Sequence, residues 1–492
     1  MALLSSTFML KVFCTIICLS IGIYAYFKFV LYTYWRKKGM PYLEPCVPVG
    51  NFLNVVRKKC HIGEIFSYGY EKLKYNKVFG MYTFHKPCLV VADPDLIRNV
   101  LTKEFTSFHD RGVYCNEKVD PLSGNLFFLP GKKWKTLRSK LSPAITPGKM
   151  KLMFGCLKDR GIDLENFLKD KARKPKIVEM QEIFARFTTD IIMTTVFGVD
   201  CNTLHDADSE YRYWGKQVFE AHNIKNAVGF FAPQILDFFS IPFNDVGVQK
   251  FFMTVFQETV NYRLNNNIKS QDFLDLIIQL MNKGYVNGDD GESIQKSSGF
   301  ETSSTTAAHC LYELAIHHDI QEEVRQEIFS QLGEKGDLTY DSLNEMPYLQ
   351  KVVCETLRKY PPVSLLNRVC TKDIQFLNTD IKISKGIDIV IPVLGIHRDP
   401  DIYPDPMKFD PERFNEKNTV SRHPYTFLPF GEGPRICIGM RFGLAQVKVA
   451  IISALRNCRV SLGPNTQVPL PIDPEKMAYT SKFGIHLKME LL

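Results

Sequence analysis

Apolar residues recur at helical spacing along most of the 492-residue chain. Side chains three and four positions apart share one face of a helix, so this period predicts amphipathic helices that each bury one face. The period is clearest in residues 133–141, 181–197, 251–264, 273–281, 305–316, 321–332 and 349–359. Alternating apolar and polar positions predict a hairpin over 77–91 and a smaller strand-rich patch over 374–391. The pattern therefore predicts a mainly α-helical fold with minor β-sheet.

A polar stretch over residues 282–298 interrupts this pattern. It holds Gly284, the pair Asn287-Gly288 and Gly291, and it has no apolar period. Glycines and Asn-Gly pairs are typical of turns, so we expect a loop here.

The longest apolar run lies near the amino terminus. Residues 12–27 carry no charge, and beyond Lys28 the run continues to Trp35, long enough to cross the roughly 30 Å hydrocarbon layer as a helix. Three basic residues, 36–38, follow at once, so the positive-inside rule places the rest of the chain in the cytosol. A cleaved signal peptide is the alternative, but the run is too long for one and no small-x-small cleavage site follows. We predict a membrane anchor and basic stop over 1–38 and one domain over 39–492.

Composition narrows the class of protein. A 45% hydrophobic and 12% aromatic content suits a single large body with a substantial core. Thirteen cysteines without a C-x-x-C pair favour free thiols in a reducing compartment. The formal charge of +8 comes without a nucleic-acid-binding module, so a membrane surface or an acidic protein partner is favoured over nucleic acid.

One segment carries unusual chemistry, the glycine-punctuated loop 430–439 with the sequence FGEGPRICIG. Its thiol, Cys437, has the setting of an axial ligand to haem iron. Gly433 and Gly439 let the backbone approach a flat macrocycle, Arg435 can pair with a propionate, and Phe430 can shield the sulfur from water. A buried free cysteine in a glycine loop is the alternative interpretation.

This loop resembles the cysteine loop of the cytochrome P450 family, the haem-thiolate monooxygenases. Further motifs in the family's order extend the resemblance over nearly the whole chain. The residues in and around these motifs are most similar to those of the insect detoxification branch. The resemblance implies the cytochrome P450 fold with an N-terminal transmembrane helix, and haem b as the cofactor.

Other site residues follow from that resemblance. Trp134 and Arg138 match the family's Trp-x-x-x-Arg helix, whose side chains reach a haem propionate. Arg368 and Arg111 match other propionate-binding arginines, although an ordinary surface role for Arg111 is equally compatible with its motif. Buried carboxylates need cations beside them, because unpaired charge is costly to desolvate.

A second motif pair implies a structural triad. Glu355 and Arg358 lie three apart on one predicted helix face and can pair. Arg413, in the downstream motif Pro-Glu-Arg-Phe, joins them in the family as a buried charged triad behind the cysteine loop. A solvated surface pair is the alternative for Glu355 and Arg358 taken alone.

The segment from Gly299 to Thr302 resembles the family's distal oxygen-binding groove. There the glycine, Gly299, lets dioxygen approach the helix, the hydroxyl of Thr302 hydrogen-bonds bound oxygen, and the acid Glu301 relays protons. In the family this groove lies midway along a long apolar helix, yet residues 291–298 here are polar. About four helical turns that roof the pocket in the family are missing. A skipped exon, a faulty gene model and a decayed paralogue all fit this departure.

The function implied is a membrane-bound monooxygenase of the endoplasmic reticulum, with its catalytic domain on the cytosolic face. It would insert one atom of O2 into an apolar small molecule, and aromatic candidates for the pocket lining include Phe127, Phe128 and Phe483, with Leu365 and Leu366. Because the chain has no nicotinamide or flavin motif, electrons would come from NADPH through a separate NADPH–cytochrome P450 reductase, with cytochrome b5 as a further donor. The rival interpretations are a haem-binding relative with impaired or no turnover and a membrane-bound structural protein without haem.

Overall fold

The computed structural model describes residues 2–173, 177–218, 223–268, 273–282, 300–333, 336–376 and 379–492. The helices are α1 (Ala2–Phe29), α2 (Tyr34–Lys37), α3 (Leu53–Val56), α4 (Ile62–Leu73), α5 (Pro94–Arg98), α6 (Gly131–Leu141), α7 (Pro147–Ala172), α8 (Met180–Ile192), α9 (Glu210–Gln217), α10 (Asn223–Phe231), α11 (Pro233–Phe238), α12 (Val246–Asn265), α13 (Phe273–Asn282), α15 (Phe300–Ile316), α16 (His318–Leu332), α17 (Tyr340–Asn344), α18 (Pro347–Lys359), α19 (Val393–His397), α20 (Glu416–Ser421) and α21 (Met440–Leu455). The strands are β1 (Val78–Thr83), β2 (Lys86–Val91), β3 (Ile177–Glu179), β4 (Leu366–Val369), β5 (Ile374–Gln375), β6 (Lys382–Ile383), β7 (Asp388–Ile391), β8 (Cys458–Leu462) and β9 (His486–Leu491).

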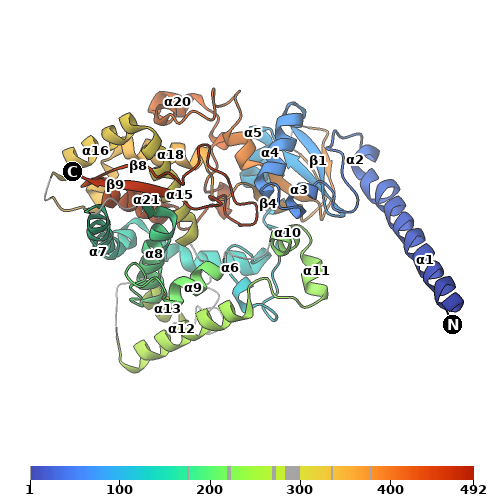
Figure 1. Ribbon diagram of the computed structural model, residues 1–492, viewed down its shortest axis with the longest axis horizontal. Helices are drawn as coiled ribbons and strands as arrows, with labels where there is room; N and C mark the ends of the chain where they lie inside the picture. The colour runs from blue at the N-terminus through green and yellow to red at the C-terminus, as the bar shows by residue number, and fades with distance from the viewer. Residues whose placement is uncertain are drawn as a thin grey trace.

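The two ends of the body differ in secondary structure. Most helices pack at one end, and a sheet of order β1-β2-β7-β4 lies at the other end, next to the base of α1 (Figure 1). In that sheet β1 and β2 form an antiparallel hairpin and β2 runs parallel to β7. A second sheet, β3-β9-β8, and the small pair β5-β6 complete the strands of the described residues.

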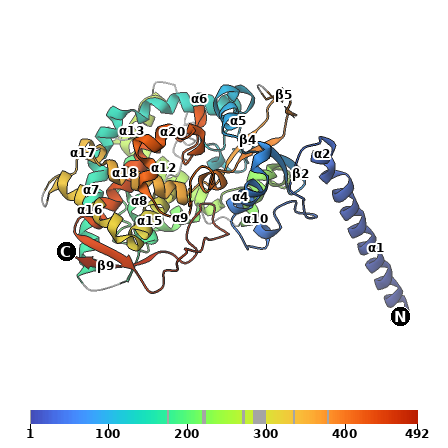
Figure 2. The same cartoon turned by 90° about the horizontal axis from the view of Figure 1, so that it is seen from above.

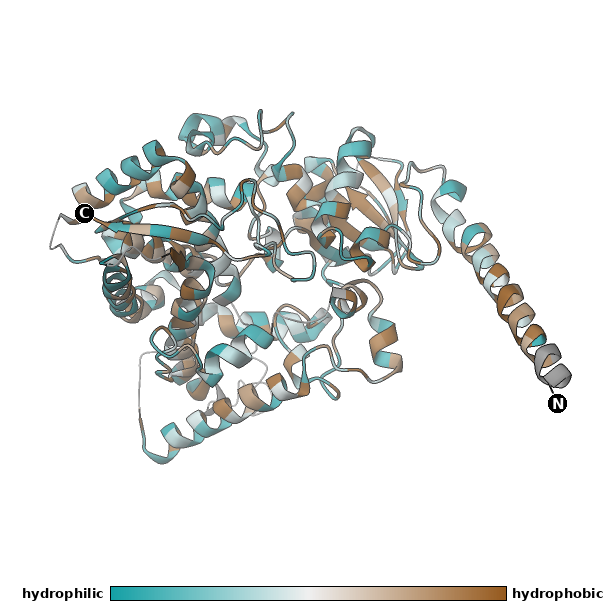
Figure 3. Cartoon of the chain, viewed as in Figure 1, coloured by the Kyte–Doolittle hydropathy of each residue, from teal (hydrophilic) through white to brown (hydrophobic). Residues whose placement is uncertain are grey.

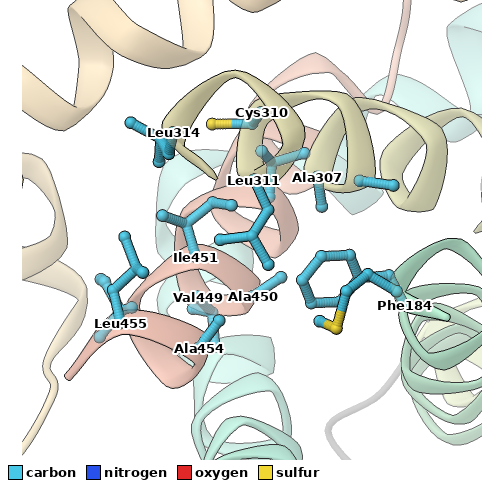
Figure 4. Close-up of a cluster of buried hydrophobic side chains, with 14 of the residues drawn as sticks. Phe184, Ala307, Cys310, Leu311, Leu314, Val449, Ala450, Ile451, Ala454 and Leu455 are labelled. Atoms are coloured by element: carbon cyan, nitrogen blue, oxygen red, sulfur yellow. The ribbon is translucent and has the colours of Figure 1, made fainter. Parts of the chain in front are cut away.

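Helix α15 lies at the centre of the helical part. It packs against α8, α18 and α21, and its apolar side chains interlock with those of α21. In Figure 4, Ala307, Leu311 and Leu314 point towards Val449, Ala450 and Ile451 of α21. These side chains are almost completely buried, so α15 is held by close apolar packing along this face.

The predicted elements are largely confirmed. Each of the predicted helical segments lies in a helix, with residues 193–197 of the second segment in a π-helical turn, and β1 and β2 form the predicted hairpin. The strand-rich patch contains β5, β6 and β7. The prediction missed α4 and the 26-residue α7. The expected loop over 282–298 lies, apart from Asn282 at the end of α13, outside the described residues.

Helix α1 projects from the sheet end of the body as a separate rod (Figures 1 and 2). Residues Phe8–Lys37 form the segment that is long and apolar enough to cross a membrane, with a mean hydropathy of 2.1 in its best window. Figure 3 shows hydrophobic residues along much of this rod, and near its end Phe27 packs against the core of the body. This agrees with the predicted apolar helix.

The apolar run assigned to the membrane extends too far in the sequence prediction. The chain kinks after Phe29, and Tyr32 and Trp35 are only 6% and 3% exposed, packed into the core beneath β1. The Trp35 indole N–H donates to Met81 O at 3.0 Å, and the Tyr32 hydroxyl donates to Phe84 O at 2.9 Å. The prediction that the lipid-buried stretch reaches Trp35 is therefore wrong, because the body itself offers these side chains apolar surface and backbone acceptors.

Candidate active site

The loop that holds Cys437 folds back on itself. The Cys437 N–H donates to Phe430 O at 3.0 Å and closes the loop. Gly433 has φ +74°, and a Cβ there would lie 2.0 Å from Leu101 O, so both its conformation and its surroundings require glycine. Gly439 ends the loop directly before α21. These constraints present the Cys437 thiol to an internal cavity, where its sulfur is accessible. At Gly439, in contrast, an added Cβ would meet no atom within 4 Å, so protein packing does not require glycine there.

The surroundings of Cys437 have opposing effects on the pKa of its thiol. Burial raises the pKa of the Cys437 thiol, whereas a hydrogen bond from Gly439 N–H and the charges of Arg111 and Arg138 act in the opposite direction. A thiolate is the form that ligates metals. The surrounding residues therefore favour the ionised sulfur only in part, and a bound metal ion would supply the remainder.

A buried cluster of arginines lies beside the thiol. Arg111, Arg138, Arg368 and Arg435 come from four different segments of the chain, and each is close enough to others to influence their ionisation. Burial, then the charge of Arg111, lowers the pKa of Arg435 to about 9, and burial followed by the charges of Arg111 and Arg435 lowers the pKa of Arg368 well below its usual value. The nearest carboxylate recorded for the cluster is Asp110, whose Oδ1 lies 3.6 Å from Arg435 Nη2. The cluster carries more positive charge than the nearby carboxylate balances.

Local contacts hold these arginines in place. Arg435 donates to the carbonyl oxygens of His109 at 2.8 Å and Leu129 at 2.9 Å. Its guanidinium lies 4.1 Å from the ring centre of Trp134, which is on α6 one turn before Arg138. Arg111 donates to Phe127 O at 2.9 Å. The structure thus brings Trp134, Arg138, Arg111 and Arg435 to one wall of the cavity.

Behind the loop, the structure brings together Glu355, Arg358 and Arg413. Arg358 pairs with Glu355 through two 2.7 Å hydrogen bonds, and Arg413 Nε lies 3.5 Å from Glu355 Oε1. Glu355 and Arg358 are fully buried. Arg358 also donates to His397 O at 2.9 Å, and His397 Nε2 accepts from the Leu428 N–H at 2.8 Å. This chain of bonds connects α18 to the start of the cysteine loop.

The cavity has a volume of about 430 Å³ and is mostly apolar. Among the residues proposed for its lining, Phe127, Phe128 and Leu366 lie on its wall. Phe483 is 55% exposed and Leu365 is buried elsewhere, and neither is part of the wall, so these two predictions are wrong. A more open cleft of about 820 Å³ between residues 70–94 and residues 399–426 mixes acidic and basic side chains and lies away from Cys437.

The distal side of the cavity is formed by the start of α15. Thr302, Ser303 and Thr306 line the cavity there. Glu301 turns away from it, and Glu301 Oε2 lies 3.8 Å from Arg212 Nη1, which is held by Glu182 through 3.0 and 2.7 Å hydrogen bonds. Gly299 lies outside the described residues. The predicted distal residues are therefore split between the cavity wall and a buried ion cluster between α8 and α9.

Sequence reasoning missed much of the lining. The missed residues come from α7, α8 with its following turn, α12 and α21, and include Met150, Met153, Ile192, Phe197, Phe252, Phe256, Leu444 and Gln446. Most are ordinary apolar positions on amphipathic helices. Periodicity indicates that such a residue is buried, but not whether it faces a cavity or another helix.

Among the described residues one cysteine thiol faces the apolar cavity beside the arginine cluster, which is the arrangement that a haem group with a thiolate ligand requires. Comparison with known proteins agrees. The family model for cytochrome P450 matches residues 40–489. The chain is 39% identical over 487 residues to probable cytochrome P450 6a14 of Drosophila melanogaster, covering 94% of this chain and 96% of that protein.

Other insect relatives give similar values. Cytochrome P450 6k1 of Blattella germanica is 38% identical over 499 residues, with 95% of each chain covered. Cytochrome P450 6A1 of Musca domestica is 38% identical over 487 residues, with 93% of this chain and 94% of that protein covered. The chain belongs to the cytochrome P450 family.

Members of this family bind haem b, and the residues here fit that group. The Nε of Arg368 is buried and has no hydrogen-bond partner among the described residues. Such an atom beside other desolvated arginines calls for an anionic ligand. Haem b carries two carboxylates, which would balance the charge of the arginines, and an iron, which would bind the exposed Cys437 sulfur.

Proposed function

We propose that this chain is a membrane-bound haem-thiolate monooxygenase that inserts one atom of O2 into apolar organic molecules with electrons from NADPH. The observation that carries the proposal is the Cys437 thiol facing an apolar cavity beside an arginine cluster. The chemistry that haem supplies in this family is the splitting of dioxygen, with one atom inserted into substrate and the other released as water. The remaining work falls to side chains of this chain.

These side chains bind, shield and supply protons. Cys437 would ligate the iron, and Arg111, Arg138, Arg368 and Arg435 with Trp134 would hold the two carboxylates. Phe127, Phe128 and Leu366 would exclude water and present an apolar surface to substrate. Thr302 would donate a hydrogen bond at the distal side, and Glu301 would exchange protons with it after leaving Arg212.

An absorption spectrum of the reduced, carbon monoxide-bound protein tests the proposal. Thiolate ligation moves the main band far from its position in a histidine-ligated haem protein. We expect the thiolate position. A band at the histidine position, or no haem uptake by the purified chain, would refute the proposal.

A separate reductase supplies the electrons under this proposal. Lys132, Lys133 and Lys135 are exposed on α6, the helix that carries Trp134 and Arg138 to the cavity wall. Complementary charge raises the rate at which an acidic donor such as NADPH–cytochrome P450 reductase or cytochrome b5 associates. Reversing these charges (K132E/K135E) should slow reduction by reductase in stopped flow and leave reduction by dithionite unchanged.

We place the protein in the endoplasmic reticulum membrane with its body on the cytosolic face, anchored through α1. The test compares two deletions, of residues 2–30 and of residues 2–38. Both remove the apolar helix, but the shorter one keeps Tyr32 and Trp35 in the core. We expect detergent, but not high salt, to release the intact chain from microsomes, and we expect only the longer deletion to lose stability, by about 3–5 kcal/mol for Trp35 alone. Complete release of the intact chain by salt would contradict the anchor.

A haem-binding relative with impaired turnover is the second candidate. Described helix α15 begins at Phe300, one residue before Glu301, and the sequence ahead of it lacks an apolar period. A distal side without a roof admits water, which supplies protons without control and diverts electrons to peroxide. Inserting an apolar helical segment between Lys296 and Gly299 should then raise the product formed per NADPH consumed. Tight coupling in the unmodified chain would exclude this candidate.

A further inference from the structure

One face of α15 carries polar side chains along its whole length. Glu301, Thr305, His309, Glu313 and His317 follow one another at four-residue spacing, so each is a neighbour of the next on the helix surface. They are distinct from the apolar side chains that face α21 in Figure 4. A helix at the centre of a core has no packing reason to carry such a row.

His309, in the middle of this row, is a buried side chain whose polar atoms have no evident role in packing. It is 1% exposed, and neither ring nitrogen has a hydrogen-bond partner among the described residues. The ring stacks on Tyr360 with a centroid distance of 4.6 Å and an interplanar angle of 14°. Stacking would be served equally well by phenylalanine, so it does not account for the two polar atoms. Buried polar atoms are normally paired, most often with ordered water when protein groups are out of reach.

Outward from His309 the row reaches solvent. Glu313 is 1% exposed and accepts hydrogen bonds from the Tyr360 hydroxyl at 2.5 Å and from Lys359 Nζ at 2.7 Å. Its second oxygen, Oε2, lies 3.5 Å from His317 Nδ1. The His317 side chain is 31% exposed. A titratable group at the surface is thus in contact with a buried carboxylate one helical turn from His309.

Inward from His309 lie Thr305, which belongs to the row, and the neighbouring Thr306, which lines the cavity. Thr305, one turn away, is 1% exposed, and its hydroxyl also lacks a hydrogen-bond partner among the described residues. Thr306, three residues before His309, donates to Thr302 O at 2.8 Å and lines the cavity together with Thr302. Two unsatisfied polar groups therefore stand in sequence between the buried carboxylate and the cavity wall.

We propose that the polar groups from His317, directly after α15, through Glu313, His309 and Thr305 to Thr306 on α15 form a proton path that ordered water completes. The inference rests on the proposed function, because the protons are those that dioxygen reduction consumes at the cavity. Each proton that leaves the path at Thr306 is replaced by one entering from solvent at His317, so no group on the path changes its net protonation. A neutral imidazole suits the middle position, since it accepts a proton at one nitrogen and gives one up at the other.

The surroundings keep His309 neutral. Burial and then the charge of Arg398 lower its pKa to about 3. The charged and titratable groups packed near it are Glu313 on α15, His317 directly after it, Lys359 and Tyr360 at the end of α18, Arg398 after α19, and Tyr479, which Arg398 contacts. The positive charge of Arg398 opposes an imidazolium, while Glu313 lies nearer the entry, where a positive proton carrier is favoured.

The test compares His309→Phe and His309→Gln, with His318→Phe as a matched control at the exposed neighbouring histidine. Turnover of 7-ethoxycoumarin, a small apolar ether, is measured with NADPH and reductase and again with hydrogen peroxide, which brings its own electrons and protons. We expect His309→Phe to slow the NADPH-driven reaction about tenfold, less than the loss of a direct proton donor, and to increase its solvent isotope effect. The peroxide-driven rate should be unchanged, His309→Gln should lie between, and His318→Phe should match the parent.

Equal losses with NADPH and peroxide, or no loss in either, would overturn the proposal, because His309 would then be structural or irrelevant. If the parent protein gives no NADPH-driven turnover, a high-resolution crystal structure decides independently of activity. Ordered water bonded to His309 and Thr305 supports the path, and a dry His309 refutes it. The carbon monoxide spectrum of each variant shows separately whether the haem-thiolate assignment itself has failed.

Discussion

The two walls of the cavity are built on different principles. On the cysteine side, a loop with glycine-dependent turns is fixed by Arg435 bonds to backbone carbonyls and by the buried Glu355–Arg358 pair. On the α15 side, apolar packing against α21 fixes the helix, while His309 and Thr305 carry polar atoms without protein partners in the described part of the chain. The cysteine wall is thus held by paired charges, whereas the helix on the other side keeps buried polar groups without a protein partner among the described residues.

The largest expected effect comes from breaking the cysteine wall at its centre. Cys437→Ser removes the one cysteine thiol that lines the described cavity, so the thiolate-type spectrum and monooxygenase activity should both be abolished. Cys46→Ser, at an exposed cysteine near the amino terminus, should change neither. A Cys437→Ser protein with the parent spectrum would show that another group ligates the iron.

The next effect separates the buried charges from ordinary surface pairs. Glu355→Gln leaves Arg358 buried without its counter-ion and should lower the free energy of unfolding by about 3–5 kcal/mol. Glu412→Gln, which breaks a half-exposed pair with Lys351, should cost less than about 1 kcal/mol. Urea denaturation of both apoproteins measures the difference. Equal losses would mean that burial does not distinguish the two pairs.

Replacing an arginine should separate cofactor binding from protein stability. Arg435→Leu and Trp134→Ala should lower haem occupancy, with affinity falling about ten- to a hundredfold for the lost charged contact. Arg368→Leu should do the same without lowering apoprotein stability, because Arg368 makes one backbone hydrogen bond, its Nε is unpaired among the described residues, and burial already disfavours its charge. The ratio of haem to protein absorbance and the melting temperature of the apoprotein check the two effects. Full haem occupancy in all three variants would show that this cluster does not hold the carboxylates.

The smallest effect, when measured over a single pH unit, concerns His309 on α15. His309 has a folded-state pKa of about 3, well below the ordinary value of 6.5. Above pH 6.5 the imidazole is neutral in both folded and unfolded protein and adds no pH dependence. As the pH falls from 6.5 towards 3, the unfolded chain takes up a proton that the folded protein refuses, so stability is lost by up to about 1.4 kcal/mol per pH unit. His309→Phe should flatten this part of the stability curve, and an unchanged slope would mean that His309 is charged in the folded protein.

Features that depend on neighbouring residues could be predicted from the sequence. The amphipathic helices, the hairpin of β1 and β2, the glycine-dependent loop of Cys437 and the one-turn spacing of Trp134 and Arg138 all follow from local geometry, which the order of residues determines. The Glu355–Arg358 pair belongs here as well, because its partners lie on one helix face.

Features that depend on distant segments meeting were decided by the tertiary structure. Glu301 faces Arg212 instead of the cavity because α9 places a cation beside the start of α15. Trp35 lies in the core instead of the membrane because β1 provides a carbonyl acceptor and apolar side chains for it to pack against. Phe483 does not line the pocket because its loop is exposed. A helical period indicates which face is buried but not what lies opposite, so the arginine cluster, the apolar lining and the polar face around His309 emerged only when the helices were packed together.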